Sequence, residues 1–460
     1  MSVLWTSDEI ARATNGVASS SFEVTGVAFD SREVTGGDLF VALHGESADG
    51  HTYIPGALSS GAAGLLVDRA VEGPCVRVED TARGLDDLGK AARARTQAKV
   101  VGVTGSVGKT GVKEALFRAF DRMSHGAAHR SLKSYNNHVG VPLSLARMPR
   151  EARYGVFEMG MNHEGELRAL TALVRPHIAI VTTIAPAHIE YFGTEEKIAL
   201  AKAEIFEGLV EGGTAVIPAD SPHASLLADI AAHYASQVVS FGVGADADVR
   251  LIDEMPAGPA GTRITAQTRS GRLSFTVGMP GRHWVSNALG VLAVVEAAGG
   301  DLAQAGLALA EMTGLPGRGA RRPIATADGG EALVIDESYN ANPASMVATL
   351  AQLGQEPARR RIAILGAMKE LGDQSAALHA GLAQAVRAAQ VDLALLVGEE
   401  TAPLADALAG EISLERVENA DQAIEFARSN LKNGDVVLIK GSNSIGLSRL
   451  VERLSASEVA

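Results

Sequence analysis

Residues 104–110, Thr-Gly-Ser-Val-Gly-Lys-Thr, combine the residue types that bind a polyphosphate. Gly105 and Gly108 allow backbone amides to turn toward phosphate oxygens, and a helix starting at this point favours negative charge at its N-terminus. The Lys109 ammonium can reach the β- and γ-phosphates, and the Thr110 hydroxyl can ligate Mg²⁺. The alternative is a glycine-rich turn without a ligand. We predict that the whole loop binds ATP: Thr104, Gly105, Ser106, Val107, Gly108, Lys109 and Thr110.

The residues around this loop predict that it joins a strand to a helix. Residues 100–103 form a short apolar run typical of a buried strand, and the apolar residues between 112 and 120 fall on one helical face. Val103 stands where the common phosphate-loop pattern has a glycine, so the loop is a shorter variant.

Two further groups follow predicted strands. Glu158 comes after the strand candidate 155–157, and His188 comes after the strand candidate 178–181. Carboxyl ends of parallel strands meet at one edge of a sheet, so Glu158 should lie near the phosphate loop, where a carboxylate can hold Mg²⁺. The alternatives are a solvated acid at a strand end for Glu158 and a structural role for His188. The residues alone favour a solvated helix lysine at Lys202.

The elements that must position these groups predict an α/β fold with three domains. Residues 1–96 hold short strands between turns, and residues 97–313 alternate strands and helices as a parallel sheet requires. After the glycine- and proline-rich stretch 314–319, residues 314–460 repeat that alternation as a Rossmann-like domain. The runs 263–268 and 272–277 predict a hairpin, which we expect as a small antiparallel annex of the central domain.

Composition excludes several classes of function. The net charge of −13 argues against general nucleic-acid binding, and Cys75, the only cysteine, rules out an intrachain disulfide and a cysteine-based zinc cluster. No apolar run approaches the ~20 residues that span a bilayer. The acidic start of the chain does not resemble a secretory leader, so we expect a cytoplasmic protein.

The phosphate-loop variant resembles the Mur ligase family, which makes the cytoplasmic peptidoglycan precursor, and its folylpolyglutamate synthase relatives. The resemblance covers nearly the whole chain, and it implies two Mg²⁺ ions and a carbamylated Lys202 in the motif Ala201-Lys-Ala-Glu-Ile-Phe206. A carbamate is an anionic oxygen ligand, whereas an ammonium would repel the metal. The resemblance implies Lys109, Glu158, His188 and Lys202 as catalytic residues and Thr110, Glu158, His188 and Lys202 as metal ligands.

The same resemblance assigns contacts to the substrates. It implies that the N-terminal domain binds a uridine nucleotide through Ser31 and Arg32, in a motif that also includes the run 45–51. The alternative for both segments is ordinary turn chemistry. The resemblance also implies that Asn136 and Asn137 contact substrate. Asn287, Arg318 and Asp336 are implied as further ATP contacts. Trp284, Ala367 and Asn443 depart from the residues common in the family, which are asparagine, aspartate and arginine.

The run 336–345 resembles the family members that add D-alanyl-D-alanine to UDP-N-acetylmuramoyl-tripeptide, and it implies Asn340 and Asn342 as substrate contacts in the C-terminal domain. We therefore expect a monomeric, ATP-dependent amide ligase that forms an acyl phosphate and releases ADP and phosphate. One alternative is another Mur or folylpolyglutamate-type ligase. A second is a phosphate-loop switch that hydrolyses nucleotide without joining anything, although the Asn-Lys-x-Asp motif of GTPases does not occur.

Overall fold

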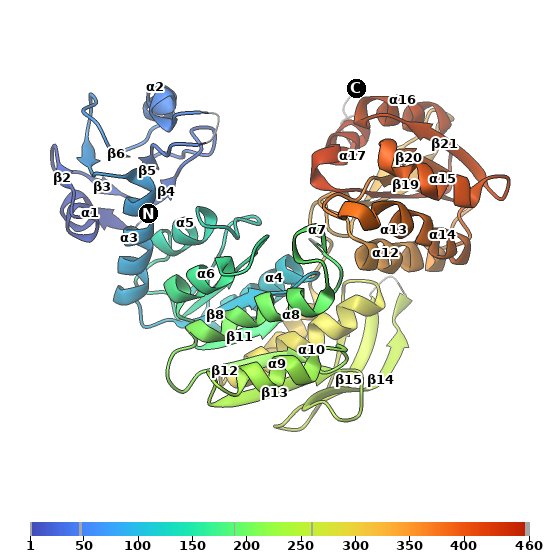
Figure 1. Cartoon of the computed structure of the whole chain (residues 1–460), viewed down its shortest axis with the longest axis horizontal. Helices are drawn as coiled ribbons and strands as arrows, with labels where there is room; N and C mark the ends of the chain where they lie inside the picture. The colour runs from blue at the N-terminus through green and yellow to red at the C-terminus, as the bar shows by residue number, and fades with distance from the viewer. Residues whose placement is uncertain (1, 46–47, 188, 259–260, 456–460) are drawn as a thin grey trace.

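The computed structural model describes residues 2–45, 48–187, 189–258 and 261–455, which form three α/β units (Figure 1). Each unit has its own main sheet, of five, nine and six strands in chain order. The predicted α/β fold with three domains is confirmed. The domain boundaries at 96/97 and 313/314 remain predictions.

The N-terminal unit is built on a mostly parallel sheet in the order β2-β7-β6-β5-β4, with β1 and β3 paired separately. Helix α3 begins where the Asp80 carboxylate accepts hydrogen bonds from the amides of Ala82 and Arg83, which satisfies the first free N–H groups of the helix. The elements are β1 Trp5–Thr6, α1 Ser7–Thr14, β2 Val17–Ala18, β3 Glu23–Val24, β4 Gly26–Ala28, β5 Asp38–Val41, η1 Gly50–Tyr53, α2 Ile54–Ser59, β6 Gly64–Val67, β7 Cys75–Arg77 and α3 Thr81–Arg95.

The central unit has the sheet order β16-β15-β14-β13-β12-β11-β8-β10-β9, in which β8 lies between β11 and β10. All pairs from β9 to β14 are parallel. The elements are β8 Lys99–Thr104, α4 Lys109–Ser124, β9 Ala128–Arg130, α5 Gly140–Ala146, β10 Tyr154–Glu158, α6 Glu166–Val174, β11 Ile178–Val181, α7 Ile189–Phe192, α8 Glu195–Ala203, η2 Glu204–Gly208, β12 Thr214–Pro218, α9 Ala224–Ala231, β13 Gln237–Gly242, β14 Val249–Pro256, β15 Thr262–Gln267, β16 Arg272–Val277, α10 Arg282–Ala297 and α11 Leu302–Ala310.

The predicted hairpin of the central unit is confirmed as β15 and β16, which pair antiparallel with Thr265 opposite Ser274. Strand β14, which was not predicted, pairs antiparallel with β15 and parallel with β13. The antiparallel annex is therefore a continuation of the central sheet.

The C-terminal unit has the order β17-β18-β22-β19-β20-β21, with only β17 antiparallel to its neighbour. Four of these strands were predicted, and the edge strands β17 and β21 were not. The elements are β17 Ala320–Ala325, β18 Glu331–Glu337, α12 Pro343–Gln355, β19 Arg360–Gly366, η4 Gly372–Gln374, α13 Ser375–Gly381, α14 Ala383–Ala388, β20 Leu393–Val397, η5 Glu399–Thr401, α15 Ala402–Leu408, β21 Ser413–Val417, α16 Ala420–Asn430, β22 Asp435–Lys440, η6 Asn443–Ile445 and α17 Leu447–Ser455.

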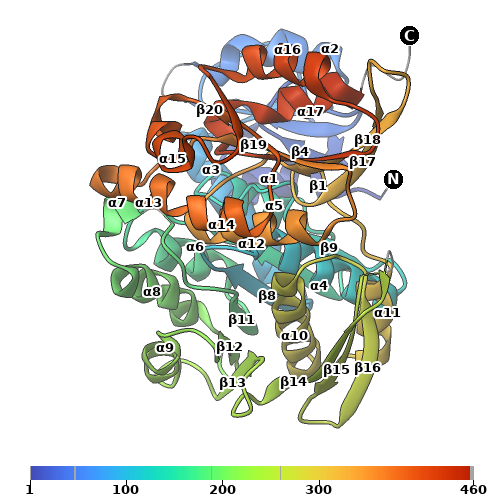
Figure 2. The ribbon, with the colours of Figure 1, turned by 90° about the vertical axis from the view of Figure 1, so that its right-hand side faces the viewer.

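Contacts between the units bring their loops together. Arg93 at the end of α3 donates to the carbonyls of Val174 and Arg175, which attaches the N-terminal unit to the central one. On the other side, α7 contacts η4 of the C-terminal unit, which leads into α13 (α7 and α13 are labelled in Figure 2). The Glu190 amide donates to the Glu370 carbonyl.

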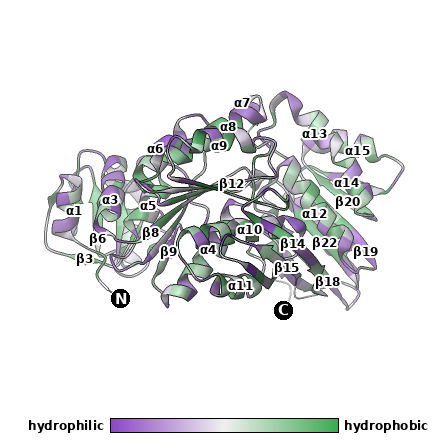
Figure 3. Ribbon diagram, turned by 90° about the horizontal axis from the view of Figure 1, so that it is seen from below, coloured by the Kyte–Doolittle hydropathy of each residue, from purple (hydrophilic) through white to green (hydrophobic). Residues whose placement is uncertain are grey.

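Hydrophobic residues concentrate in the strands of the sheets (Figure 3), as burial of the apolar faces requires. Among the described residues, no helix is both long enough and apolar enough to cross a membrane.

Candidate active site

A cavity of about 530 Å³ opens between the central and C-terminal units. Its wall on the central side includes the phosphate loop, Glu158 and the start of α10, and its opposite wall includes Arg318, residues 339–342 and Lys440. Ligands commonly bind at such junctions between domains.

The phosphate loop joins β8 to α4, as predicted. Gly105 and Gly108 have φ angles of 148° and 90°, which favour glycine, and a Cβ carbon at Gly105 would lie 2.0 Å from Thr182 Oγ1. Lys109 Nζ donates to the Gly105 carbonyl at 2.6 Å, and burial lowers its pKa. The loop is thus bent back on itself at the N-terminus of a sixteen-residue helix, where phosphate binding is favoured.

Glu158 ends β10 beside the loop, as the parallel register predicts. Its side chain is buried, with Oε2 accepting from the Thr110 hydroxyl and Oε1 accepting from Asn136 Nδ2, both at 2.8 Å. The structure therefore brings together Thr110, Glu158 and Asn136. A hydroxyl and a carboxylate at one point form a hard oxygen donor set, which fits Mg²⁺.

Lys113 is a residue of this site that the sequence analysis missed. Its side chain is fully buried, and Nζ donates to the Lys133 carbonyl while lying 3.2 Å from Glu114 Oε1 and 3.8 Å from Glu158 Oε2. Lys113 follows Lys109 by four residues on α4, so the two ammonium groups share one side of the helix. The four-residue spacing from Lys109 is the sequence feature that could have predicted Lys113 as a residue of this site.

Lys202 is not the solvated lysine that its helical context favoured. It lies on α8 with a relative exposure of 1%, and its pKa is well below the usual value because burial and the nearby Lys109 both disfavour the ammonium. Among the described residues, no carboxylate forms an ion pair with Lys202. His188 lies outside the described residues, so its predicted role stays a prediction.

Helix α10 supplies another wall of the cavity. Asn287 is buried against the phosphate loop, where a Cβ carbon at Gly108 would lie 2.9 Å from Asn287 Oδ1. Trp284, one of the departures from the family pattern, is buried one turn earlier and also lines the cavity. His283 beside it has a pKa lowered to about 4 by burial and by Lys440.

The linker to the C-terminal unit places Arg318 opposite the phosphate loop. Arg318 Nη2 lies 3.4 Å from Ser134 Oγ, and its guanidinium carbon is 4.1 Å from the centre of the Tyr339 ring. Asp336 binds backbone and hydroxyl groups instead: Oδ2 accepts from the Gly317 amide and Oδ1 from the Ser338 hydroxyl. Asp336 therefore shapes the linker that carries Arg318.

Asn340 and Asn342 line the C-terminal wall of the cavity. Asn342 caps α12, because its Oδ1 accepts from the Ser345 amide while Ser345 Oγ accepts from the Asn342 amide. Lys440 Nζ donates to the Asn340 carbonyl at 2.9 Å and pairs with Glu337 at 3.5 Å. Glu337 and Lys440 were not predicted as site residues. Burial raises the pKa of Glu337 and lowers that of Lys440.

The predicted contacts of the N-terminal unit lie on an exposed turn. Arg32 forms an ion pair with Asp30 at 2.6 Å, next to Ser31. The neighbouring Glu33 accepts from Lys133 and from the Tyr135 hydroxyl, which connects this turn to the loop that carries Asn136.

Asn137, unlike Asn136, does not line the cavity. Its Oδ1 accepts from the amides of Val139 and Gly140 at the start of α5. Asn137 therefore shapes the chain beside the cavity in this structure, and its predicted contact with substrate stays a prediction.

Comparison with protein families gives three matches in chain order. Residues 23–95 match the description "Mur ligase family, catalytic domain", residues 103–295 match "Mur ligase middle domain", and residues 322–443 match "Mur ligase, glutamate ligase domain".

Individual relatives match over almost the full length. A UDP-N-acetylmuramoyl-tripeptide--D-alanyl-D-alanine ligase from Rickettsia prowazekii is 32% identical over 98% of this chain and 99% of its own. The crystal structure of MurF from Acinetobacter baumannii superposes with a TM-score of 0.83 at 29% identity, covering 98% of this chain and 99% of that one. The MurF ligase from Thermotoga maritima in complex with ADP gives a TM-score of 0.77 at 26% identity, over 94% and 97% of the two chains.

Proposed function

The chain belongs to the Mur ligase family, and from that premise we propose that it joins D-alanyl-D-alanine to UDP-N-acetylmuramoyl-tripeptide at the expense of ATP. The observation that carries this proposal is the full-length similarity to ligases named for that reaction. The cavity between the phosphate loop and residues 340–342 supports this proposal. The tripeptide carboxylate, ATP and the dipeptide amine must meet at one place, and the cavity lies where they could do so.

The phosphate loop binds and orients ATP in the proposed reaction. Lys109 leaves the Gly105 carbonyl and pairs with the β- and γ-phosphates, while the amides of the loop hold their oxygens. A carboxylate oxygen of the tripeptide attacks the γ-phosphorus, the bond to the β-phosphate oxygen breaks, and acyl phosphate and ADP form. Arg318 faces the loop from the C-terminal unit and would stabilise the charge of the transferring phosphoryl group.

The acceptor amine then attacks the acyl carbon. The tetrahedral intermediate expels inorganic phosphate, the amine loses one proton, and an amide remains. Asn340 and Asn342 border the part of the cavity where this amine would approach. Positioning supplies most of the acceleration, since phosphate is already a good leaving group.

Thr110 and Glu158 would hold Mg²⁺, with His188 and a carbamylated Lys202 completing two sites. The bound ions would neutralise the phosphate charge. The hydroxyl–carboxylate pair at 2.8 Å fits such ions, because both groups offer hard oxygen ligands. Asn136 holds the second oxygen of Glu158 and so orients the carboxylate.

Carbamylation of Lys202 is supported by its burial and its neighbour. CO₂ adds only to a neutral amine, and a lowered pKa increases the neutral fraction near pH 7. The addition forms an N–C bond and releases one proton. The resulting anion would lie near the Lys109 ammonium, and this opposite charge favours the carbamate.

Five further residues would contribute to substrate and nucleotide binding. Ser31, Arg32 and Asn137 would contact the UDP-linked substrate. Asn287 would contact the nucleotide directly, and Asp336 would shape the linker at the nucleotide site.

We place the enzyme in the cytoplasm as a monomer. Its reaction would belong to peptidoglycan precursor synthesis, which serves cell-wall growth, cell shape and division.

Mass spectrometry of the product tests the proposal. Wild-type protein with ATP, Mg²⁺, UDP-N-acetylmuramoyl-tripeptide and D-alanyl-D-alanine should form the pentapeptide product with one ADP and one phosphate each. Lys109→Ala should form none. Product formed with a free amino acid instead of the dipeptide would favour another Mur-type ligase, and ATP hydrolysis without any amide would favour a nucleotide switch.

A further inference from the structure

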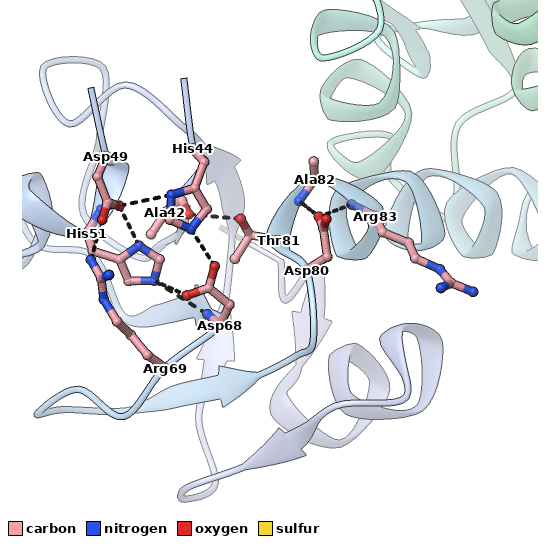
Figure 4. A network of polar contacts seen from close by, with 10 residues as sticks. All are labelled: Ala42, His44, Asp49, His51, Asp68, Arg69, Asp80, Thr81, Ala82 and Arg83. Atoms are coloured by element: carbon pink, nitrogen blue, oxygen red, sulfur yellow. Dashed lines mark hydrogen bonds and ion pairs between the residues drawn. The ribbon is translucent and has the colours of Figure 1, made fainter. Parts of the chain in front are cut away.

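Two imidazoles and a carboxylate converge in the N-terminal unit (Figure 4). None of these three residues lines the cavity described above. His44 follows β5, His51 lies in η1, and Asp68 follows β6. One ligand atom from each residue lies within 4.8 Å of the other two. His44 Nε2 is 2.6 Å from Asp68 Oδ2, and His51 Nε2 is 3.2 Å from Asp68 Oδ1.

The second nitrogen of each ring faces a different carboxylate, that of Asp49. His51 Nδ1 lies 2.7 Å from Asp49 Oδ1, and His44 Nδ1 lies 3.6 Å from the same oxygen. The His51 amide and the Arg69 guanidinium also donate to Asp49, which fixes the position of its carboxylate. Metal-binding histidines typically donate their other N–H to a carboxylate in this way.

With the His51 proton on Nδ1, the Nε2 nitrogen can act as a metal ligand on the side of Asp68. When His51 Nδ1–H donates to Asp49, Nε2 carries a lone pair, and the Asp68 amide donates weakly to it at 3.4 Å. The Asp68 carboxylate lies on the same side, with Oδ1 3.2 Å from Nε2. In this tautomer, the nitrogen and the carboxylate both offer lone pairs toward one point, as the ligands of a metal ion must.

We propose that His44 Nε2, His51 Nε2 and the Asp68 carboxylate bind one divalent transition-metal ion, for which Zn²⁺ is the best fit. Imidazole nitrogens favour zinc over Mg²⁺, and zinc accepts a tetrahedral set of two histidines, one carboxylate and water. Binding through Nε2 requires the His44 proton to lie on Nδ1, the nitrogen that faces Asp49. The half-exposed His44 ring leaves room for the water and for the small rotation that bonds of about 2.0–2.2 Å require.

The ion would tie the segment after β5 to the end of β6, since its ligands come from both. This site stabilises the N-terminal unit and does not depend on the proposed ligation.

Metal stoichiometry and stability test the proposal on the full chain. Protein freed of metal with EDTA is incubated with a small excess of Zn²⁺ in Mg²⁺-free buffer, passed through a desalting column and measured by elemental mass spectrometry. Wild-type protein should retain one more zinc per chain than His44→Ala or Asp68→Asn. The unfolding temperature should rise with zinc in wild-type protein and not in these two variants. Asp49→Asn should lower the affinity about 10- to 100-fold, because it loosens the orientation of both rings.

His233→Ala is the matched control, since His233 is an exposed histidine on another unit whose ring contacts the Asp229 carbonyl. It should retain wild-type stoichiometry. The difference between variants also separates this site from zinc bound at Glu158. Equal zinc content in wild-type, His44→Ala and Asp68→Asn would overturn the proposal, as would a wild-type protein that retains no zinc. Circular dichroism confirms that each variant is folded.

Discussion

The Trp284 indole packs directly on Gly111 in the first turn of α4, where a Cβ carbon would lie 2.8 Å from Trp284 Cη2. The glycine therefore makes room for the tryptophan. Because the contact lies directly after the phosphate loop, it links the fit of α10 to the geometry of the nucleotide site.

Gly111→Ala should weaken nucleotide binding even though alanine favours helices, because the added methyl group displaces Trp284. Overpacking of this kind costs about 1–3 kcal/mol. We expect a higher KM for ATP with little change in overall secondary structure. The double variant Gly111→Ala/Trp284→Asn should recover much of the loss, and independent, additive effects of the two changes would contradict a direct coupling.

Lys113→Met should lower kcat and raise the Mg²⁺ concentration needed for half-maximal activity. The substitution removes the buried cation between Glu158 and the Lys133 carbonyl, so both the acid and the loop carrying Asn136 lose their orientation. Loss of one partner from a buried pair typically costs about 3–5 kcal/mol. Lys90→Met, which removes an exposed pair with Asp87, should change activity and stability little. An unchanged Mg²⁺ dependence in Lys113→Met would show that Lys113 does not position Glu158.

Lys202→Ala should abolish ligation, and an added short carboxylate such as acetate should restore part of it by supplying the missing anionic oxygen. Wild-type activity should rise with bicarbonate, and this response should weaken as pH falls and the amine becomes protonated. Lys197→Ala on the exposed side of the same helix is the control and should remain active. Wild-type levels of activity in Lys202→Ala would exclude a metal-binding role.

His129 should make the fold less stable in weak acid. Burial lowers its pKa to about 4 from 6.5, so between those values the unfolded chain binds a proton that the folded chain excludes. The resulting decrease in the free energy of unfolding is absent above pH 6.5 and reaches about 3 kcal/mol as pH falls to 4. His129→Gln should reduce the slope of unfolding free energy against pH in this window, measured by urea denaturation. His233→Ala should keep the wild-type slope, and an equal slope in His129→Gln would refute the prediction.

The sequence by itself determined the features that depend on local pattern and on shared motifs. The strand before the phosphate loop, the loop, α4 and the parallel alternation follow from residue spacing, and Glu158 was placed correctly because parallel strands end at one edge. The family resemblance added the role of each domain and the candidate substrate.

Only the tertiary structure decided which side chains face the cavity and what they contact. Lys113 and Lys202 look like ordinary helix lysines, and their burial depends on loops and helices distant in sequence. Asp336 matches a nucleotide-contact position and Asn342 a substrate-contact position, yet both hold backbone groups. The Glu337–Lys440 pair joins residues more than 100 positions apart. The convergence of His44, His51 and Asp68 has the same cause, because the ends of parallel strands bring together residues that no local spacing connects.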